Sequence, residues 1–310
     1  MRDVLLQQII NGLVLGSMYA LIALGYTMVY GIIQLINFAH GEVLMVGALT
    51  AWSVIGMMQA SMPGAPGWAI LIMAMLIACV VAAALNFVIE KVAYRPLRNS
   101  PRLAPLITAI GMSILLQTLA MIIWKPNYKP FPTLLPSAPF NVFGAFITPT
   151  QIMILSVTAV SLAVLMWLVH YTRIGRAMRA TAENPRVAGL MGVKPDVVIS
   201  ATFIIGAILA AIAGVMYASN YGTAQHTMGF LPGLKAFTAA VFGGIGNLGG
   251  AVLGGILLGL IEAIGSGYIG QLTGGLLGSH YTDIFAFIVL IIILTLRPSG
   301  LLGERVADRA

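Results

Sequence analysis

The sequence predicts an all-α protein, a polytopic bundle of about 8–10 transmembrane helices. Three observations support this prediction. Hydrophobic residues make up 59% of the 310 residues, and charged residues make up only 8%, where a soluble domain carries about 25%. Apolar runs, many close to the roughly 20 residues that a helix needs to cross a bilayer, follow one another along the chain. No run resembles a soluble domain, so we expect one transmembrane domain over residues 1–310.

The first two thirds of the chain contain long apolar runs. The first run exceeds the roughly 7–15 apolar residues of a signal peptide, so we interpret it as a transmembrane helix. Arg2 before it is offset at once by Asp3, which also argues against a signal peptide. The long runs are Leu5–Tyr30, Val43–Met58, Trp68–Ile89, Leu103–Trp124, Gln151–Tyr171 and Val197–Tyr217.

Shorter, glycine-rich apolar pieces follow in the C-terminal third, where we expect short or broken helices. These pieces are Leu234–Ile245, Gly249–Ile264 and Tyr281–Leu296. If each piece crosses the membrane, the N-terminus lies outside the cell.

Basic residues gather in three clusters, each beside an apolar run: Lys91–Arg102, Arg173–Lys194 and Arg297–Arg309. Because cytoplasmic loops of membrane proteins are enriched in Lys and Arg, the net charge of +7 indicates topology rather than a nucleic-acid partner. We therefore place the three clusters in the cytoplasm. The loop Lys125–Thr150, rich in proline and aromatic residues, is then expected outside.

Small residues recur at four-residue spacing and so share one face of a helix. In lipid, such faces let two helix backbones approach closely. The pairs are Gly12 with Gly16, Ala210 with Gly214, Gly250 with Gly254, and Gly255 with Gly259. They predict a compact bundle and indicate no particular partner.

Two carboxylates lie in or beside apolar runs, where a charge costs about 2.5–3.5 kcal/mol at a helix centre. Glu42 ends a polar string that includes Asn37 and His40. We favour Glu42 as a helix-start carboxylate, with Asn37 or His40 capping the turn, over a polar wall of a translocation path. Glu262 is expected near a membrane interface. Three amides in other runs are expected to bond neighbouring helices: Asn11, Asn86 and Gln117.

A basic loop between two apolar runs is shaped to meet a soluble partner. Arg176, Arg179, Glu183 and Arg186 recur at a spacing of three and four residues, which predicts one face of a short helix. A proline within the stretch would start or kink this helix, and two glycines would end it; these are Pro185, Gly189 and Gly192. The alternative is an ordinary positive-inside loop that anchors the topology.

Enzyme chemistry finds little support in the sequence. The histidines lie far apart, with no carboxylate or cysteine at a metal-ligand spacing. The phosphate-binding motif G-x-x-x-x-G-K-[ST] does not occur, so this chain does not hydrolyse ATP through a P-loop. If transport is driven by ATP, the motor is another polypeptide.

Three strings carry a resemblance to a known family. They are Ile36–Glu42, the loop from Arg173 through Glu183-Asn184-Pro185 to Gly192, and the glycine-rich Gly243–Ala251. With these strings the chain resembles the permeases of branched-chain amino-acid ABC importers, and among them the LivH-type subunit. The resemblance covers essentially the whole chain.

The resemblance implies a non-catalytic permease of the bacterial inner membrane that moves leucine, isoleucine or valine by alternating access. Its implied partners are a second, LivM-like permease, two P-loop ATPases that hold ATP and Mg, and a periplasmic binding protein. No cofactor is implied for this chain. A cytoplasmic coupling loop is implied at about residues 172–196. Its residues would be Arg173, Gly175, Arg176, Arg179, Glu183, Asn184, Pro185, Ala188, Gly189 and Gly192.

Other functions stay open at this point. The family also contains permeases for urea and short amides, which an apolar path suits nearly as well. A secondary transporter fits the glycine-interrupted short segments but would need ionisable residues at mid-membrane. An intramembrane serine protease would use Ser266 and His280, which no supporting motif surrounds. The sequence fixes neither the substrate, nor the residues that line the path, nor whether the permease pairs with itself or with a relative.

Overall fold

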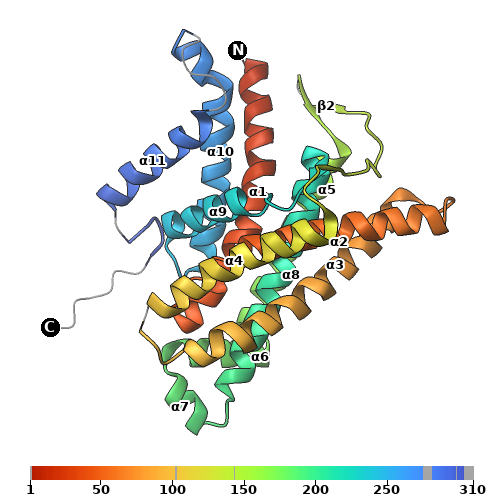
Figure 1. The fold of residues 1–310 in the computed structure, drawn as a ribbon. Helices are drawn as coiled ribbons and strands as arrows, with labels where there is room; N and C mark the ends of the chain where they lie inside the picture. Colours follow the sequence, from red (N-terminus) through yellow and green to blue (C-terminus); the bar gives the residue numbers. More distant parts are fainter. Residues whose placement is uncertain (1, 102, 143, 275–280, 298, 304–310) are drawn as a thin grey trace.

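The computed structural model describes residues 2–101, 103–142, 144–274, 281–297 and 299–303 (Figure 1). His280 and most of the basic cluster Arg297–Arg309 lie outside this range. The described chain is almost entirely helical. Its α-helices are α1 (Arg2–Ile33), α2 (His40–Ser61), α3 (Gly67–Ile89), α4 (Leu103–Trp124), α5 (Pro149–Tyr171), α6 (Arg173–Glu183), α7 (Pro185–Leu190), α8 (Pro195–Tyr221), α9 (Phe230–Gly243), α10 (Leu248–Leu272) and α11 (Thr282–Leu296).

Short elements of other kinds occur at the ends of these helices. The end of α3 continues into a π-helical turn, η1 (Glu90–Tyr94), and a 3₁₀ turn, η2 (Arg95–Leu97). Two small antiparallel pairs join strand β1 to β4 and strand β2 to β3. These strands are β1 (Lys129–Pro130), β2 (Phe140–Val142), β3 (Ala145–Ile147) and β4 (Thr223–Ala224).

Seven helices of the described residues are long and apolar enough to cross a membrane: α1, α2, α3, α4, α5, α8 and α10. Two shorter apolar helices, at Phe230–Gly243 and Phe287–Leu296, complete the set. The predicted polytopic helical bundle is thereby confirmed. One detail was wrong: the piece expected to be short at Gly249–Ile264 belongs to α10, which is 25 residues long. In the described part of the C-terminal third, only α9 and α11 are short.

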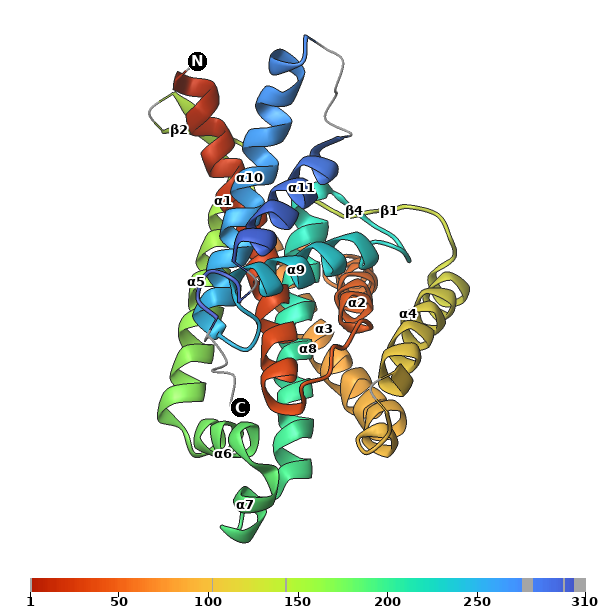
Figure 2. The ribbon, with the colours of Figure 1, turned by 90° about the vertical axis from the view of Figure 1, so that its left-hand side faces the viewer.

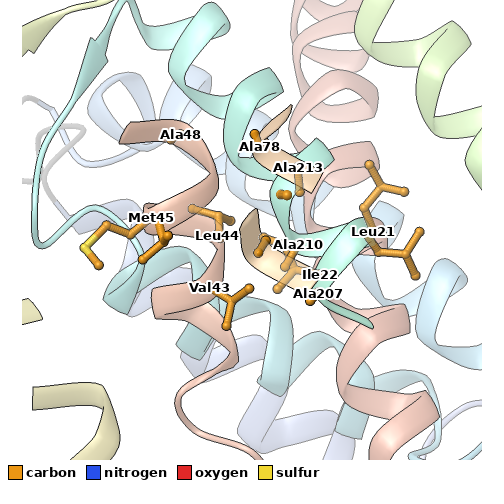
Figure 3. Packing of buried hydrophobic residues seen from close by; sticks show 14 of the residues in the cluster. Leu21, Ile22, Val43, Leu44, Met45, Ala48, Ala78, Ala207, Ala210 and Ala213 are labelled. Carbon is orange, nitrogen blue, oxygen red and sulfur yellow. The ribbon is translucent and has the colours of Figure 1, made fainter. Parts of the chain in front are cut away.

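The core lies where α1, α2, α8 and α10 meet. α1 packs most extensively against α10 and also along α8. Between α2 and α8, Leu44 lies beside Ala210 and Ala213, with Ala78 of α3 next to them (Figure 3). The small side chains on α8 let larger ones on α2 fill the space between the two backbones.

The small-residue pairs lie at the closest helix contacts. A Cβ atom on Gly12 would lie 2.8 Å from the Cα of Leu260, and one on Gly16 would lie 2.7 Å from the Cα of Ile256. These two glycines of α1 therefore rest directly on the backbone of α10, as small residues do where apolar burial cannot drive association.

The glycines of α10 face two different neighbours. A Cβ on Gly254 would lie 2.9 Å from the backbone nitrogen of Gly243 in α9, and Gly250 approaches the same residue. A Cβ on Gly255 would lie 2.6 Å from the Cα of Ala20 in α1, and Gly259 approaches the same helix. On α8, Gly214 lies against the backbone of Leu44 and Ala210 is fully buried. One side of α10 thus carries α9 and another carries α1.

The two ends of the bundle differ in what they carry. Figures 1 and 2 place the N-terminus and strand β2 at one end and helices α6 and α7 at the opposite end. Helix α9 lies between these ends, beside α10. The arrangement separates the loop Lys125–Thr150 from the basic segment after α5.

Candidate functional site

The first candidate site is the segment of α6 and α7, which we name the α6–α7 segment (Arg173–Leu190). Its first helix begins where the Thr172 side chain accepts a hydrogen bond from the Gly175 backbone nitrogen at 3.1 Å. Gly175 is pressed onto the last turn of α5, because a Cβ there would lie 2.5 Å from the carbonyl carbon of Val169. Gly175, Met178 and Thr181 form the buried face of α6. The segment is therefore seated firmly on the end of the bundle.

The segment breaks at Asn184, which takes an extended conformation between the two helices. Its side chain accepts hydrogen bonds from the backbone nitrogens of Arg186 and Val187, at 3.1 and 3.2 Å, and so caps α7. Pro185 occupies the first turn of α7, where a missing N–H costs nothing. The expectation of one helix face for Glu183 and Arg186 was wrong, because the break puts them on different helices. Gly189 also does not end the helix.

The charged residues of α6 divide into two groups. Arg179 donates a hydrogen bond to the backbone oxygen of Val169 and so ties α6 to the end of α5. Arg173, Arg176 and Glu183 are exposed. Arg179 therefore has a partner inside the chain, whereas the other three are available to a partner protein.

The tip of α7 is apolar and exposed. Leu190 and Met191 are 87% and 81% exposed, and Val187 is 52% exposed. Ala188, by contrast, is buried, which fixes the helix against the chain. Gly192, with φ of 86°, then turns the backbone toward α8. An apolar tip within a charged segment is the composition of a protein contact.

The second candidate site is a cavity of about 660 Å³ between α2, α4 and the start of α9. This size is typical of a small-molecule site. Most of its lining is apolar, with polar groups from α4 and from the stretch between α8 and α9. Its lining includes Tyr26, Phe38, Gly41, Ile110, Ser113, Ile114, Gln117, Gln225, Thr227, Met228, Gly229, Phe230, Leu231 and Leu234.

Glu42 lies behind the polar wall of this cavity. It is 1% exposed, and its Oε1 accepts hydrogen bonds from Ser113 Oγ at 3.0 Å and Gln117 Nε2 at 2.7 Å. Its Oε2 has no hydrogen-bond partner among the described residues. Glu42 is also in the first turn of α2, where a helix favours a carboxylate. The structure therefore shows the helix-start position that the sequence analysis favoured, and it places Glu42 behind two residues that line the cavity.

Asn37 and His40 do not line the cavity. Asn37 Oδ1 accepts hydrogen bonds from the backbone nitrogen of Ala39 at 3.1 Å and from Tyr94 Oη at 2.8 Å. It holds the turn before α2, although α2 has no side-chain cap. The His40 ring is buried, and its centroid lies 4.8 Å from that of Tyr26. Both residues position the start of α2.

An ion cluster that the sequence analysis missed holds α9 in place. Lys235 Nζ lies 2.7 Å from Glu262 Oε1 and 2.6 Å from Asp283 Oδ1, and Tyr19 donates a hydrogen bond to Glu262 Oε2 at 3.0 Å. The cluster joins α9, α10, α11 and α1. Lysine inside an apolar run was the available signal, since such a charge needs a partner.

A second missed cluster surrounds Glu90, whose side chain is fully buried. Arg95 Nη2 lies 3.1 Å from its Oε2, Arg98 pairs with its Oε1, and Ser200 donates a hydrogen bond at 2.8 Å. Arg98 also pairs with Asp196 in the first turn of α8, at 2.5 Å. This cluster connects the end of α3 to the residues that follow the α6–α7 segment.

The comparisons with known proteins identify the family of the chain. Residues 8–294 match the family described as branched-chain amino acid transport system / permease component. The chain is 46% identical over 304 residues to the high-affinity branched-chain amino acid transport system permease protein BraD of Pseudomonas aeruginosa. It is 45% identical over 308 residues to the permease protein LivH of the corresponding system of Escherichia coli K12. Each alignment covers 96% of both chains.

A more distant relative is the autoinducer 2 import system permease protein LsrC of Photorhabdus laumondii, 32% identical over 132 residues, which is 41% of this chain and 38% of LsrC. No solved structure matches the chain. The family match and the two long alignments show that the chain belongs to the branched-chain amino acid transport system permease components, as a non-catalytic, multi-pass membrane permease of a bacterial ABC importer that itself binds no cofactor.

Proposed function

We propose that this permease carries leucine, isoleucine and valine across the bacterial inner membrane by alternating access. The observation that carries the substrate assignment is the 45–46% identity, over 96% of both chains, to two permeases whose names specify branched-chain amino acids. The mostly apolar lining of the 660 Å³ cavity suits an aliphatic side chain. LsrC covers too little of the chain to favour a different substrate.

The complex would contain a second, LivM-like permease, two P-loop ATPases and a periplasmic binding protein. A P-loop is missing from this sequence, so ATP and Mg would be held by the ATPase chains. The binding protein would dock at the end that carries the N-terminus and the Lys125–Thr150 loop. The ATPases would dock at the opposite end.

The α6–α7 segment would be the coupling element, within residues 172–196. It lies at one end of the bundle, presents an exposed apolar tip, and is anchored through Gly175 and Arg179 to α5. A rigid, exposed element that is tied to the helices can pass movement of an ATPase to the bundle. ATP would shift the permease between states only through the ATPase chains, because ATP must bind the two states differently.

The test is purification of the tagged chain from its native membrane in mild detergent, with identification of the co-purifying proteins. We expect two ATPases and a second permease. The complex, reconstituted with its periplasmic binding protein, should import radiolabelled leucine, isoleucine and valine only with ATP. Recovery of the chain without any ATPase, or import of urea with no import of the three amino acids, would refute the assignment.

A further inference from the structure

The cavity of about 660 Å³ has one polar wall that offers hydrogen-bond acceptors to a ligand. Glu42 accepts hydrogen bonds and cannot donate them when ionised, so Ser113 must turn its O–H and Gln117 its NH₂ group toward it. Both residues line the cavity. The hydroxyl oxygen of Ser113 and the amide oxygen of Gln117 are then the acceptors that this wall offers to a ligand.

A carboxyl group stands behind these acceptors. Glu42 lies in the first turn of α2 and accepts two hydrogen bonds, both of which stabilise the carboxylate, whereas its burial, at 1% exposed, opposes the charge. A buried charge is costly without a partner of opposite sign. Among the described residues, its Oε2 has no hydrogen-bond partner and no cation is paired with Glu42. The wall therefore suits a cationic donor group.

The facing wall is the N-terminus of α9, which has the opposite polarity. Gly229, Phe230 and Leu231 line the cavity at the point where α9 begins, and no side chain caps this helix. Pro232 has no N–H and the Phe230 N–H donates to the Thr227 carbonyl, so it is the Leu231 N–H, together with the dipole of this 14-residue helix, that favours an anion there. Glu42 does not serve this purpose, because both of its hydrogen bonds run to α4.

The start of α9 lies against the start of α2, which carries Glu42. A Cβ atom on Gly41 would lie 2.5 Å from the Gly229 carbonyl oxygen, and one on Gly229 would lie 3.2 Å from the Cα of Glu42. The starts of α2 and α9 are therefore in direct contact. The remaining lining is largely apolar and includes Phe38, Ile110, Ile114, Met228 and Leu234.

We propose that this cavity is a binding site for the zwitterionic form of an aliphatic amino acid. The α-ammonium group binds to Ser113 Oγ and Gln117 Oε1 in front of Glu42, the α-carboxylate binds at the N-terminus of α9, and the side chain rests on the apolar lining. This site deepens the proposed function and rests on it. Broken helices whose N-termini face an anionic substrate group are a general device of membrane transporters.

The test uses protection of a single cysteine in the assembled complex, with the ATPases and second permease, in lipid nanodiscs without ATP or binding protein. Cys79 is the only cysteine of the chain, so Cys79→Ala gives a cysteine-free background. Gln225→Cys places a reporter in the cavity but outside the proposed contacts. Ser299→Cys lies in another cavity, beside Tyr30 and His170, and serves as the matched control. The mass of this chain reports its modification by a methanethiosulfonate reagent.

Three ligands with the same isobutyl side chain separate the contributions of the two charged groups. Leucine carries both charges, 4-methylpentanoate lacks the ammonium group, and isoamylamine lacks the carboxylate. We expect leucine to slow modification of Gln225→Cys, and each analogue to need a concentration about tenfold higher or more, because each loses a charged hydrogen-bonding group. None of the three should protect Ser299→Cys.

Glu42→Gln distinguishes the two ends of the ligand. In this variant leucine and 4-methylpentanoate should protect the reporter at similar concentrations. Isoamylamine should still need a higher concentration than leucine. If the complex does not assemble with this variant, Gln117→Leu can replace it, because it removes one acceptor of the same wall. It should change the ratio of the protecting concentrations of leucine and 4-methylpentanoate in the same direction. Equal protection by all three ligands, protection by none, or an unchanged ratio in the assembled variant would overturn the proposal.

Measuring leucine uptake distinguishes a wrong binding site from a wrong proposed function. If the complex imports leucine with ATP and its binding protein while leucine does not protect the reporter, the site is wrong and the proposed function stands. If no branched-chain amino acid is imported by the wild-type complex, the proposed function itself fails.

Discussion

The inner and outer helices of this permease are held by different interactions. In the apolar windows of α1 and α8, 72% and 67% of the residues are buried, and in α2 and α10 50% and 44% are. In α3, α4 and α5 the share is only 28%, 22% and 22%. The inner helices meet through close backbone contacts at glycine, as at Gly16 against Ile256. The outer helices also pack through buried apolar residues, such as Ala78 of α3, and each adds a polar attachment to an inner helix.

Each outer helix has its own polar attachment. Asn86 of α3 donates a hydrogen bond to the Phe203 carbonyl of α8 at 2.7 Å. Gln117 of α4 bonds Glu42 of α2, and Gln151 of α5 bonds Asn11 of α1 at 3.3 Å. Apolar surface does not drive helices together in lipid, so the inner set depends on close fit, and the outer set, with fewer buried residues, relies more on these hydrogen bonds.

The largest loss of stability is expected at the ion cluster that attaches the short helix α9. Lys235→Met leaves Glu262 and Asp283 next to each other without a cation, and removal of one partner of a buried pair costs about 3–5 kcal/mol. Asp283 is partly exposed, which places the expected value at the lower end. Thermal unfolding in detergent measures it.

A variant that also carries Glu262→Gln and Asp283→Asn should recover much of this loss. A single variant as stable as the wild type would show that the ion cluster does not hold α9 and α11.

A smaller loss is expected at an inner contact. Gly16→Leu forces the backbones of α1 and α10 apart, and overpacking of this kind costs about 1–3 kcal/mol. Gly111→Leu is the matched control in an outer helix, because nothing lies within 4 Å of a Cβ at Gly111. Equal melting temperatures for the two variants would contradict the distinction between inner and outer helices.

A single polar attachment of an outer helix should matter less again. Asn86→Leu removes the hydrogen bond from α3 to α8, and a typical net value of such a bond is about 1 kcal/mol. Asn86 is fully buried. The loss of stability is measured as a shift of the melting temperature against the wild type. A loss as large as that of Lys235→Met would show that α3 belongs to the inner set.

The smallest effect on stability is expected at the α6–α7 segment, together with a large effect on transport. Glu183→Lys changes an exposed residue, so stability should stay within about 0.5 kcal/mol. Uptake should fall while the ATPases continue to hydrolyse ATP. Arg179→Gly should differ by lowering stability as well, because Arg179 bonds the end of α5. Normal, coupled uptake in Glu183→Lys would argue against a coupling role.

Most helices could be predicted from the apolar pattern, because long apolar runs in a chain with so few charges have no other environment than lipid. The length of α10 could not be predicted in this way. Past Ile264 the sequence changes to Gly265, Ser266 and Gly267, yet the helix continues to Leu272. The backbone hydrogen bonds of a helix persist without apolar side chains. The break at Asn184 did have a signal, since Asn before Pro is a strong helix start.

The partnerships between distant residues were beyond the sequence. Glu42 and Ser113 are 71 residues apart, and the apolar pattern shows that both lie on helices but not which helices are neighbours. The same holds for Lys235 and Glu262, which belong to successive helices of unknown crossing. The sequence identified Glu42 as unusual because of its cost in lipid, and the structure supplied the cavity beside it.

Gly41 and Glu42 are adjacent in the chain, and each is attached to a different wall of the cavity. Gly41 touches the start of α9, and Glu42 holds Ser113 and Gln117 of α4. The two walls are therefore attached to adjacent residues of one helix turn, so a movement of the start of α2 is passed to both walls at once.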